Sequence, residues 1–396
     1  MLIAAARIIT ADGALPGLAP VLSPGWVQCA NGVIAAVGVG EPPRRPDVEL
    51  PDGLLLPGFV DLQVNGCFGV DLAEADADGW NAVAAGLPAT GTTAFLATFI
   101  TAPREALIAS LRRAAAVLPG LTAGARVLGV HLEGPFISPS RAGAHNPAWI
   151  GAPDGDSVAR LLGAGAGLVR LVTLAPEVDG AMAAIGQLAG AGVLVSVGHS
   201  DATAQQVSAA ATAGARMVTH LFNAQRPLHH REPGVVGQAL TDARLTSSLI
   251  GDLHHVAGQV AALAFAAAPR RICLVTDAVA CAGMPPGRYR LGGEPVELAG
   301  SDGAPPVRAD GRYAGSALRM DSAVANLVAA GIGLTDVVAA ATRIPADLIG
   351  RGDLGRIAPG AAADLVWLGD DLRARAAWVG GRQAHGPGPR ARRGGR

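Results

Sequence analysis

The feature that most constrains the fold is a long alternation of short apolar runs with alanine-rich helical stretches, which begins at Leu54 and ends near Ala278. Eight runs are candidate β-strands: LLLPGFVDLQV, TAFLAT, RVLGVHLE, LVRLVTLAP, VLVSVGH, RMVTHL, TSSLIGD and RICLVTDA. Helical segments separate most of them, and eight βα repeats within about 250 residues have the size of a (β/α)8 barrel. The sequence therefore predicts an α/β protein with a TIM-type barrel.

The segments on either side of this alternation are predicted to be β-rich. We expect a small β-sandwich domain built from both chain termini, from residues 1–54 and 346–385, beside a barrel of residues 55–345. Residues 283–315 interrupt the rhythm and predict a β-hairpin insertion after the eighth strand. Helices are expected next, at 321–330 and 335–341. The Gly-, Pro- and Arg-rich residues 386–396 are expected to form a disordered tail.

Composition excludes several classes of function. The formal net charge of −1 gives no electrostatic basis for binding nucleic acid or a membrane surface. No apolar run is long enough to span a membrane, and the N-terminus lacks the pattern of a signal peptide. The four cysteines show no paired metal-binding spacing, and a chain of this length needs no disulfides. A cytoplasmic location is therefore expected.

The chain contains no lysine, since all 31 of its Lys and Arg residues are arginine. This excludes catalysis through a Schiff-base lysine and phosphate binding by a lysine. It equally excludes a carbamylated lysine that bridges two metal ions.

Four chemically active side chains follow predicted barrel strands. His199 and His220 end the fifth and sixth strands within residues 193–237, while Glu133 ends the third and Asp277 follows the eighth. Parallel strands bring their carboxyl ends to one edge. One Glu and two His predict a catalytic metal site with an open position for water, with Asp277 beside it as a proton shuttle. Taken singly, each residue has a structural alternative as a strand or helix cap or an ion-pair partner.

The chain resembles the N-acetylglucosamine-6-phosphate deacetylases of the amidohydrolase superfamily. The resemblance rests on a set of motifs between Pro57 and Leu318: PGFVDLQVNG, HLEGPF with RAGAHNP, VGHSDAT, THLFNA with REPGVVG, LVTDA and AGSAL. As a set these motifs are highly specific, whereas PGFVD alone would indicate only an amidohydrolase.

The resemblance implies a role for each matching residue. Glu133, His199 and His220 would bind a divalent metal, Asp277 would be the catalytic acid and base, and His145 would contact the acetamido carbonyl. The implied substrate-binding residues are Ala144, His145, Asn223, Ala224, Arg231, His255, Tyr313, Ala314, Gly315 and Ser316. Arg231 and His255 would hold the sugar phosphate across the interface of a homodimer.

Two departures from common patterns bear on these roles. Where many amidohydrolases carry His-x-His for a second metal, this chain has Gln63 and Asn65, and an amide is a weak ligand for a transition-metal cation. We therefore expect one divalent metal ion per chain, with zinc first and iron, cobalt or manganese as alternatives. The motif GDLHHV has Leu253 where the family has glycine, so that the choice of His255 over His254 rests on spacing alone.

The function implied is metal-dependent hydrolysis of the acetamide of N-acetylglucosamine 6-phosphate, a small amino sugar phosphate. Two alternatives stay open at this point. The enzyme could act on another N-acyl amino sugar or a cyclic amide, or the protein could be a non-catalytic, metal-dependent sugar-phosphate binder. A binder would have no need of Asp277 as a proton shuttle.

Overall fold

The computed structural model describes residues 1–11, 20–300 and 304–387. Its centre is a parallel sheet of eight strands in sequence order, as the alternation predicted. The strands are β8 (Phe59–Val64), β11 (Thr92–Ile100), β12 (Arg126–Glu133), β13 (Val169–Leu174), β14 (Leu194–Val197), β15 (Met217–Val218), β16 (Thr246–Ile250) and β17 (Ile272–Val275). All nine residues of β11 are buried, because side chains fill the barrel inside and helices cover it outside.

The first and last strands meet near their carboxyl ends and close the barrel. Val64 pairs with Ala278 in a parallel bridge, and the Asp277 N–H donates to the Gln63 carbonyl at 2.9 Å. Below this bridge, the buried Asp61 carboxylate accepts the Thr276 hydroxyl at 2.6 Å. The predicted (β/α)8 barrel is confirmed.

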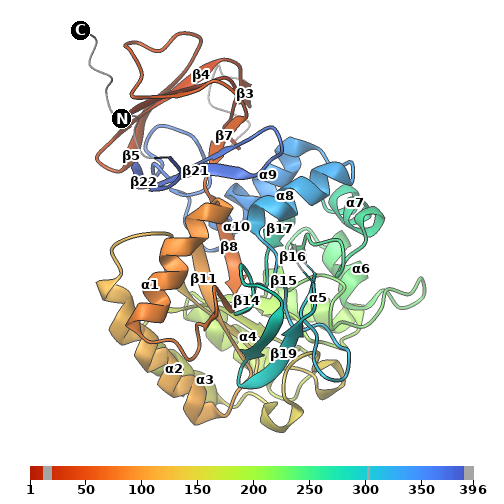
Figure 1. The fold of residues 1–396 in the computed structure, drawn as a ribbon. Coiled ribbons are helices and arrows are strands. Elements are labelled where there is room, and N and C mark those ends of the chain that lie inside the picture. Colours follow the sequence, from red (N-terminus) through yellow and green to blue (C-terminus); the bar gives the residue numbers. More distant parts are fainter. Residues whose placement is uncertain (12–19, 301–303, 388–396) are drawn as a thin grey trace.

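Helices pack around the outside of the barrel (Figure 1). They are α1 (Ala77–Gly86), α2 (Arg104–Val117), α3 (Gly155–Gly165), α4 (Ala181–Gly190), α5 (Ala204–Ala213), α6 (Gly234–Thr241), α7 (Gly258–Ala267), α8 (Met320–Ala329), α9 (Leu334–Ala341) and α10 (Arg343–Leu348). Their starts follow local rules: α5 begins at a capping box in which Thr203 and Gln206 satisfy each other's backbone N–H groups. None of the helices in the described ranges is long and apolar enough to cross a membrane.

Strands from both ends of the chain lie side by side above the barrel in Figure 1. One sheet has the order β5-β4-β1-β6 and the other β22-β21-β20-β7-β2-β3. Their bounds are β1 (Leu2–Ala5), β2 (Ile8–Ile9), β3 (Val21–Leu22), β4 (Gly25–Ala30), β5 (Val33–Val39), β6 (Val48–Leu50), β7 (Leu54–Pro57), β20 (Leu365–Leu368), β21 (Ala374–Val379) and β22 (Arg382–His385). The expected association of the two termini is therefore present.

These terminal sheets share a hydrophobic cluster distinct from the barrel core, yet β7 contributes to both. Leu55 packs into the terminal cluster, whereas Leu54 and Leu56 point to the barrel core. The division into domains at 1–54, 55–345 and 346–385 stays a prediction. Residues 388–396 of the expected tail lie outside the described part.

The run at residues 54–64, expected as one strand, is two strands that belong to different sheets. Gly58 separates β7 from β8, and a Cβ atom at this position would lie 2.1 Å from the Thr93 hydroxyl. Only glycine can therefore pass so close to β11, and the chain changes sheet there.

The insertion after the eighth barrel strand contains the expected hairpin, β18 (Gly287–Leu291) and β19 (Glu294–Leu298). Two short strands, β9 (Gly66–Cys67) and β10 (Val70–Asp71), follow β8. The expected helices at 321–330 and 335–341 correspond to α8 and α9, whereas α10 was not anticipated.

One ion pair joins the barrel to the terminal sheets and generates a test. Asp364, which is 3% exposed, accepts two hydrogen bonds from Arg126 and one from the Gly380 N–H. Asp364→Ala leaves these donors unpaired, so we expect it to lower the free energy of unfolding by about 3 kcal/mol. Urea unfolding followed by circular dichroism measures this change.

The matched control is Asp370→Ala, which breaks an exposed pair with Arg7. Exposed pairs contribute about 0–1 kcal/mol, so this variant should unfold almost as the wild type does. Equal losses in the two variants would contradict the role given to Asp364.

Candidate active site

The carboxyl ends of the barrel strands open into a cavity of about 240 Å³. Its lining residues are Asn65, Ile100, Glu133, Gly143, Ala144, His145, His199, His220, Asn223, Ala224, Ile250, His255, Asp277, Leu291, Arg312, Tyr313 and Gly315. Most of the residues singled out in the sequence are therefore brought together at one place.

Three of these side chains form a compact group of potential metal ligands: Glu133 at the end of β12, His199 after β14 and His220 after β15. The Nε2 atoms of His199 and His220 are 3.1 Å apart. Glu133 Oε1 lies 3.0 Å from His220 Nε2 and 3.5 Å from His199 Nε2. A tetrahedral zinc ion with bonds of about 2.0–2.2 Å spaces its ligand atoms at about 3.3–3.6 Å. Two of the three separations are slightly shorter than this range, and two imidazoles with a carboxylate are a set of ligands that binds a divalent cation.

The proton of the His199 ring is placed by its hydrogen bond. His199 Nδ1 lies 2.9 Å from the carbonyl oxygen of Arg141, which can only accept, so Nδ1 carries the proton. The lone pair of Nε2 therefore faces Glu133 and His220 and is free to bind a cation. His220 Nδ1 is buried without a hydrogen-bond partner among the described residues.

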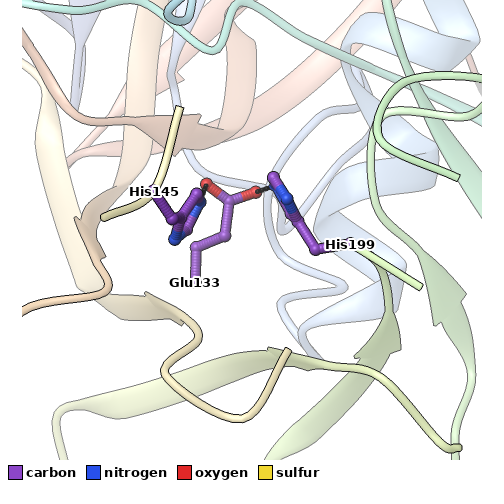
Figure 2. Close-up of side chains that lie close together, drawn as sticks. All are labelled: Glu133, His145 and His199. Carbon is purple, nitrogen blue, oxygen red and sulfur yellow. Dashed lines mark ion pairs between the residues drawn. The ribbon is translucent and has the colours of Figure 1, made fainter. Parts of the chain in front are cut away.

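His145 lies on the other side of Glu133, with its Nε2 3.5 Å from Glu133 Oε2 (Figure 2). Its Nδ1 accepts the backbone N–H of Thr101 at 3.3 Å and lies 2.7 Å from the Thr101 hydroxyl oxygen. Because a backbone N–H only donates, Nδ1 holds a lone pair and the neutral ring carries its proton on Nε2.

An alternative cation group shares two of these residues. One ligand atom each from Glu133, His145 and His199 lies within 4.8 Å of the others. The hydrogen bonds at Nδ1 make the Nε2 atom of His145 a donor, which favours binding an oxygen atom of a ligand over binding a cation. His220, whose Nε2 is closer to Glu133, is the better third ligand.

Asp277 follows β17 and is oriented by two amides from the end of β8. Asn65 Nδ2 and Gln63 Nε2 donate to its Oδ1 at 2.8 and 3.1 Å, and Gln63 Nε2 also donates to Glu133 at 2.9 Å. The amides therefore present their nitrogen atoms to the carboxylates, while their oxygen atoms, Gln63 Oε1 and Asn65 Oδ1, are buried without a hydrogen-bond partner among the described residues.

Burial and neighbouring charges shift the pKa values of the ionisable groups in the site. Burial, followed by the nearby Glu133 carboxylate, raises the pKa of Asp277 to about 7. Burial opposes ionisation of Glu133 as well, but the imidazoles around it, His145 foremost, hold its pKa well below the usual range. Burial lowers the pKa of His199 to about 4, so this ring is neutral at pH 7. A neutral imidazole beside an anionic carboxylate is the state that a cation binds.

The backbone at these strand ends adopts a sparsely populated conformation. The φ angles of His199, His220 and Asp277 are 47°, 31° and 52°, in the left-handed region that non-glycine residues avoid. Such residues cost about 1–3 kcal/mol each and persist where surrounding packing enforces them. Here the left-handed turn directs each side chain inward as the chain leaves its strand.

Further predicted residues line the cavity from the loops after β15 and β16 and from the insertion after β17. Asn223, Ala224, Tyr313 and Gly315, all predicted from the sequence, line the cavity. His255 does so too, and its Nδ1 lies 2.6 Å from Asp252 Oδ2, which orients the ring. The neighbouring His254 is exposed and does not line the cavity.

Three predicted substrate residues lie elsewhere within the described chain. Ala314 is fully buried behind the cavity wall, and the buried Ser316 hydroxyl donates to the Thr276 carbonyl. Arg231 is exposed on the loop after β15, where its guanidinium contacts His230. Their contacts with substrate stay predictions.

Five lining residues were not identified from the sequence: Ile100, Gly143, Ile250, Leu291 and Arg312. Ile100 and Ile250 are the last residues of β11 and β16, so the strand-end argument could have found them. Leu291 and Arg312 come from the insertion, whose path no local pattern specifies.

A second group of charges supports His199 from behind. The Asp201 carboxylate binds Arg141 through Oδ1 at 2.6 Å and Arg226 through Oδ2 at 2.9 Å. It therefore ties together the loops that follow β12, β14 and β15. Because the carbonyl of Arg141 accepts the His199 proton, this clamp fixes the orientation of the ring.

Comparison with known proteins identifies similar sequences. Residues 54–384 match the amidohydrolase family. The chain is 39% identical over 368 residues to an N-acetylgalactosamine-6-phosphate deacetylase of Escherichia coli O157:H7, covering 91% of this chain and 96% of that protein. It is 36% identical over 361 residues to an N-acetylglucosamine-6-phosphate deacetylase of Bacillus subtilis, covering 89% and 90%.

Solved structures of N-acetylglucosamine-6-phosphate deacetylases are similar to this chain as well. A mutant N-acetyl-D-glucosamine-6-phosphate deacetylase from Mycobacterium smegmatis, in complex with N-acetyl-D-glucosamine-6-phosphate, superposes with a TM-score of 0.91. It is 37% identical, and the match covers 97% of this chain and 99% of that one.

The Asp201 clamp generates a prediction. Asp201→Ala frees the loop of Arg141, so we expect the affinity for Zn²⁺ to fall about ten-fold, the lower end of the effect of removing an outer partner of a ligand. Chelator competition on the metal-free protein measures it. Asp353→Ala, which breaks an exposed pair with Arg351, is the control. Equal Zn²⁺ affinity in both variants would show that the clamp does not support the site.

Proposed function

We propose, from the premise that this chain belongs to the amidohydrolase family, that it hydrolyses the acetamide of N-acetylglucosamine 6-phosphate. The products are acetate and glucosamine 6-phosphate. The observation that carries the proposal is the convergence, on one cavity, of a cation-binding triangle, a separate carboxylate and a ring N–H donor. Amide hydrolysis needs these three elements.

The cation would be one divalent metal ion per chain, held by Glu133, His199 and His220. Such an ion supplies a bound water with a pKa near about 7 and polarises the scissile carbonyl. Zinc suits two imidazoles and a carboxylate best, while iron, cobalt and manganese are alternatives. Gln63 and Asn65 offer amides where a second ion would need imidazoles, and amides are weak ligands for transition-metal cations, which supports a single ion.

The chain's own residues carry the proton and orient the substrate. Asp277, held by Gln63 and Asn65, takes a proton from the attacking water and returns it to the amine nitrogen as the C–N bond breaks. His145 donates its Nε2–H to the acetyl oxygen, where negative charge develops. One such donor typically contributes about 3–4 kcal/mol to lowering the barrier.

The phosphate requires a cation that is not already paired with a carboxylate. Among the described residues Arg312 is the only arginine that lines it, and Arg312 is paired with Asp310 at 2.5 Å. Arg231 is exposed and forms no ion pair among those residues. We therefore propose a homodimer in which Arg231 of one protomer joins His255 of the other at the phosphate.

The remaining substrate contacts would be made by Ala144, Asn223, Ala224 and residues 313–316. Within that segment, the buried Ala314 and Ser316 would act by supporting the wall of the cavity. The four cysteines are all buried and free, which fits the reducing cytoplasm that we propose as the location.

A second substrate is supported by a specific finding. The Escherichia coli relative, an N-acetylgalactosamine-6-phosphate deacetylase, is 39% identical over most of both chains. The galactose epimer differs only at C4 of the sugar and is therefore a competing substrate. Another N-acyl amino sugar, or metal-dependent binding without turnover, would be the further alternatives.

The proposal is tested by acetate release from both 6-phosphates, with and without a chelator. We expect turnover that chelation abolishes and added Zn²⁺ restores. Asp277→Asn should lower kcat by about 10²–10⁴-fold while substrate still binds, because an amide cannot take the proton. Binding without acetate release by the wild type would indicate the non-catalytic alternative, and a higher kcat/KM for the galactose epimer would reassign the substrate.

The role of Arg231 is tested by comparing phosphorylated and unphosphorylated substrate. Each lost hydrogen bond to a charged group costs about 1.5–3 kcal/mol, so Arg231→Ala should lower kcat/KM for the 6-phosphate by at least about ten-fold. N-acetylglucosamine, which never makes the contact, should be almost unaffected. Arg244→Ala, at an exposed arginine paired with Asp242, is the control. An equal fall for both substrates would refute the assignment.

Mixing two variants tests whether the arginine crosses the interface. A heterodimer of Arg231→Ala and Asp277→Asn protomers contains one site with both an intact Asp277 and the arginine of the other protomer. Activity towards the 6-phosphate should therefore reappear when the two are co-refolded. Without recovery, Arg231 would serve the site of its own chain or none.

A further inference from the structure

We propose that the β18–β19 hairpin sets the length of the acyl group that the enzyme removes, with Leu291 and Ile100 forming the wall that stops the acyl chain. This inference rests on the proposed amide hydrolysis and names the acyl specificity of the same site.

The wall is a continuous apolar surface on one side of the cavity. Leu291 and Ile100 both line the cavity and belong to one buried cluster. The other members of that cluster are Val279, Cys281, Val296, Leu298 and Ala314, with Ala144 packed against them. An apolar surface gains nothing from contact with a sugar hydroxyl or a phosphate, so its natural occupant is the hydrocarbon end of the acyl group.

The position of the wall relative to the reacting groups supports this occupant. Ile100 immediately precedes Thr101, whose N–H and hydroxyl hold the ring of His145. Ala144, beside His145, packs on the same cluster. A carbonyl oxygen bound to His145 Nε2 therefore directs its alkyl substituent towards Ile100 and Leu291. His255, proposed for the phosphate, follows β16, which β17 and β8 separate from β11 in the closed barrel, so the sugar would extend away from Ile100.

The hairpin turn is anchored, which makes the wall rigid. The Gly292 N–H donates to the buried Asp71 carboxylate at 3.0 Å, and Asn146 Nδ2 donates to Glu294 at 2.9 Å. A Cβ atom at Gly292 would lie 2.7 Å from Ile100 Cδ1, so the turn already packs directly on that side chain. Because the anchored turn and the Ile100 side chain are in direct contact, neither can move aside. The space beyond the acetyl carbon is therefore fixed.

The segment after the hairpin also holds the loop that carries His145, the proposed N–H donor. Arg308 donates to the Ala144 carbonyl at 2.6 Å and Arg312 to the Gly143 carbonyl at 2.8 Å. The insertion thus positions both the wall and the loop of His145. A change in the wall alone should therefore alter the ratio of kcat/KM values between substrates of different acyl length.

The test compares N-acetyl, N-propionyl and N-butyryl glucosamine 6-phosphate. A methylene that does not fit a pocket typically costs about 10–200-fold in kcat/KM, so the wild type should discriminate steeply against the longer chains. Leu291→Ala removes the wall, and the ratio of kcat/KM for butyryl over acetyl should rise at least ten-fold. Leu291→Val, a smaller truncation, should shift the ratio in the same direction and by less.

The matched control is Leu298→Ala, in the same cluster and hairpin but outside the cavity lining. It should leave the butyryl-to-acetyl ratio unchanged. An unchanged ratio in both Leu291 variants, or the same shift in Leu298→Ala, would overturn the inference while the proposed function stands. A wild type that releases no acid from any of the three compounds would instead overturn the proposed function, and the inference with it.

Discussion

The arrangement of the site depends on a single buried charge, the carboxylate of Glu133. This group is 3% exposed, and burying an isolated carboxylate is prohibitively unfavourable. Three imidazoles and the Gln63 amide surround it, drawn from the ends of four barrel segments. Such a concentration of donors can be built only where parallel strands end together, so the barrel is a precondition of the site.

The same charge explains why the orientation of the imidazole rings around Glu133 matters. Imidazoles that face an anion must present defined nitrogen atoms, and two of the three rings are fixed by a partner on the far side: the Arg141 carbonyl for His199 and the Thr101 N–H for His145. These outer hydrogen bonds differ in direction. One ring therefore offers a lone pair and the other an N–H, so that two residues of the same type take different chemical roles.

The barrel and the insertion divide the tasks of the enzyme. Strand ends supply the groups proposed for the chemistry, on a backbone whose left-handed turns are enforced by packing. The insertion and the loops after β15 and β16 supply cavity walls, which we propose surround the sugar, the phosphate and the acyl group. Loops of this kind can vary without disturbing the barrel, which is how related barrels come to accept different substrates.

The sequence by itself determined the barrel and the residues at its strand ends. Glu133, His199, His220 and Asp277 were identifiable because a strand and its end are local, visible within a few residues of apolar pattern. Only the tertiary structure decided the rest: the split of residues 54–64 between two sheets, the choice of His255 over His254 as a cavity residue, and the place of Leu291 and Arg312. These depend on contacts between distant segments, such as that of Arg312 with Gly143, 169 residues apart, and no local pattern encodes such a meeting.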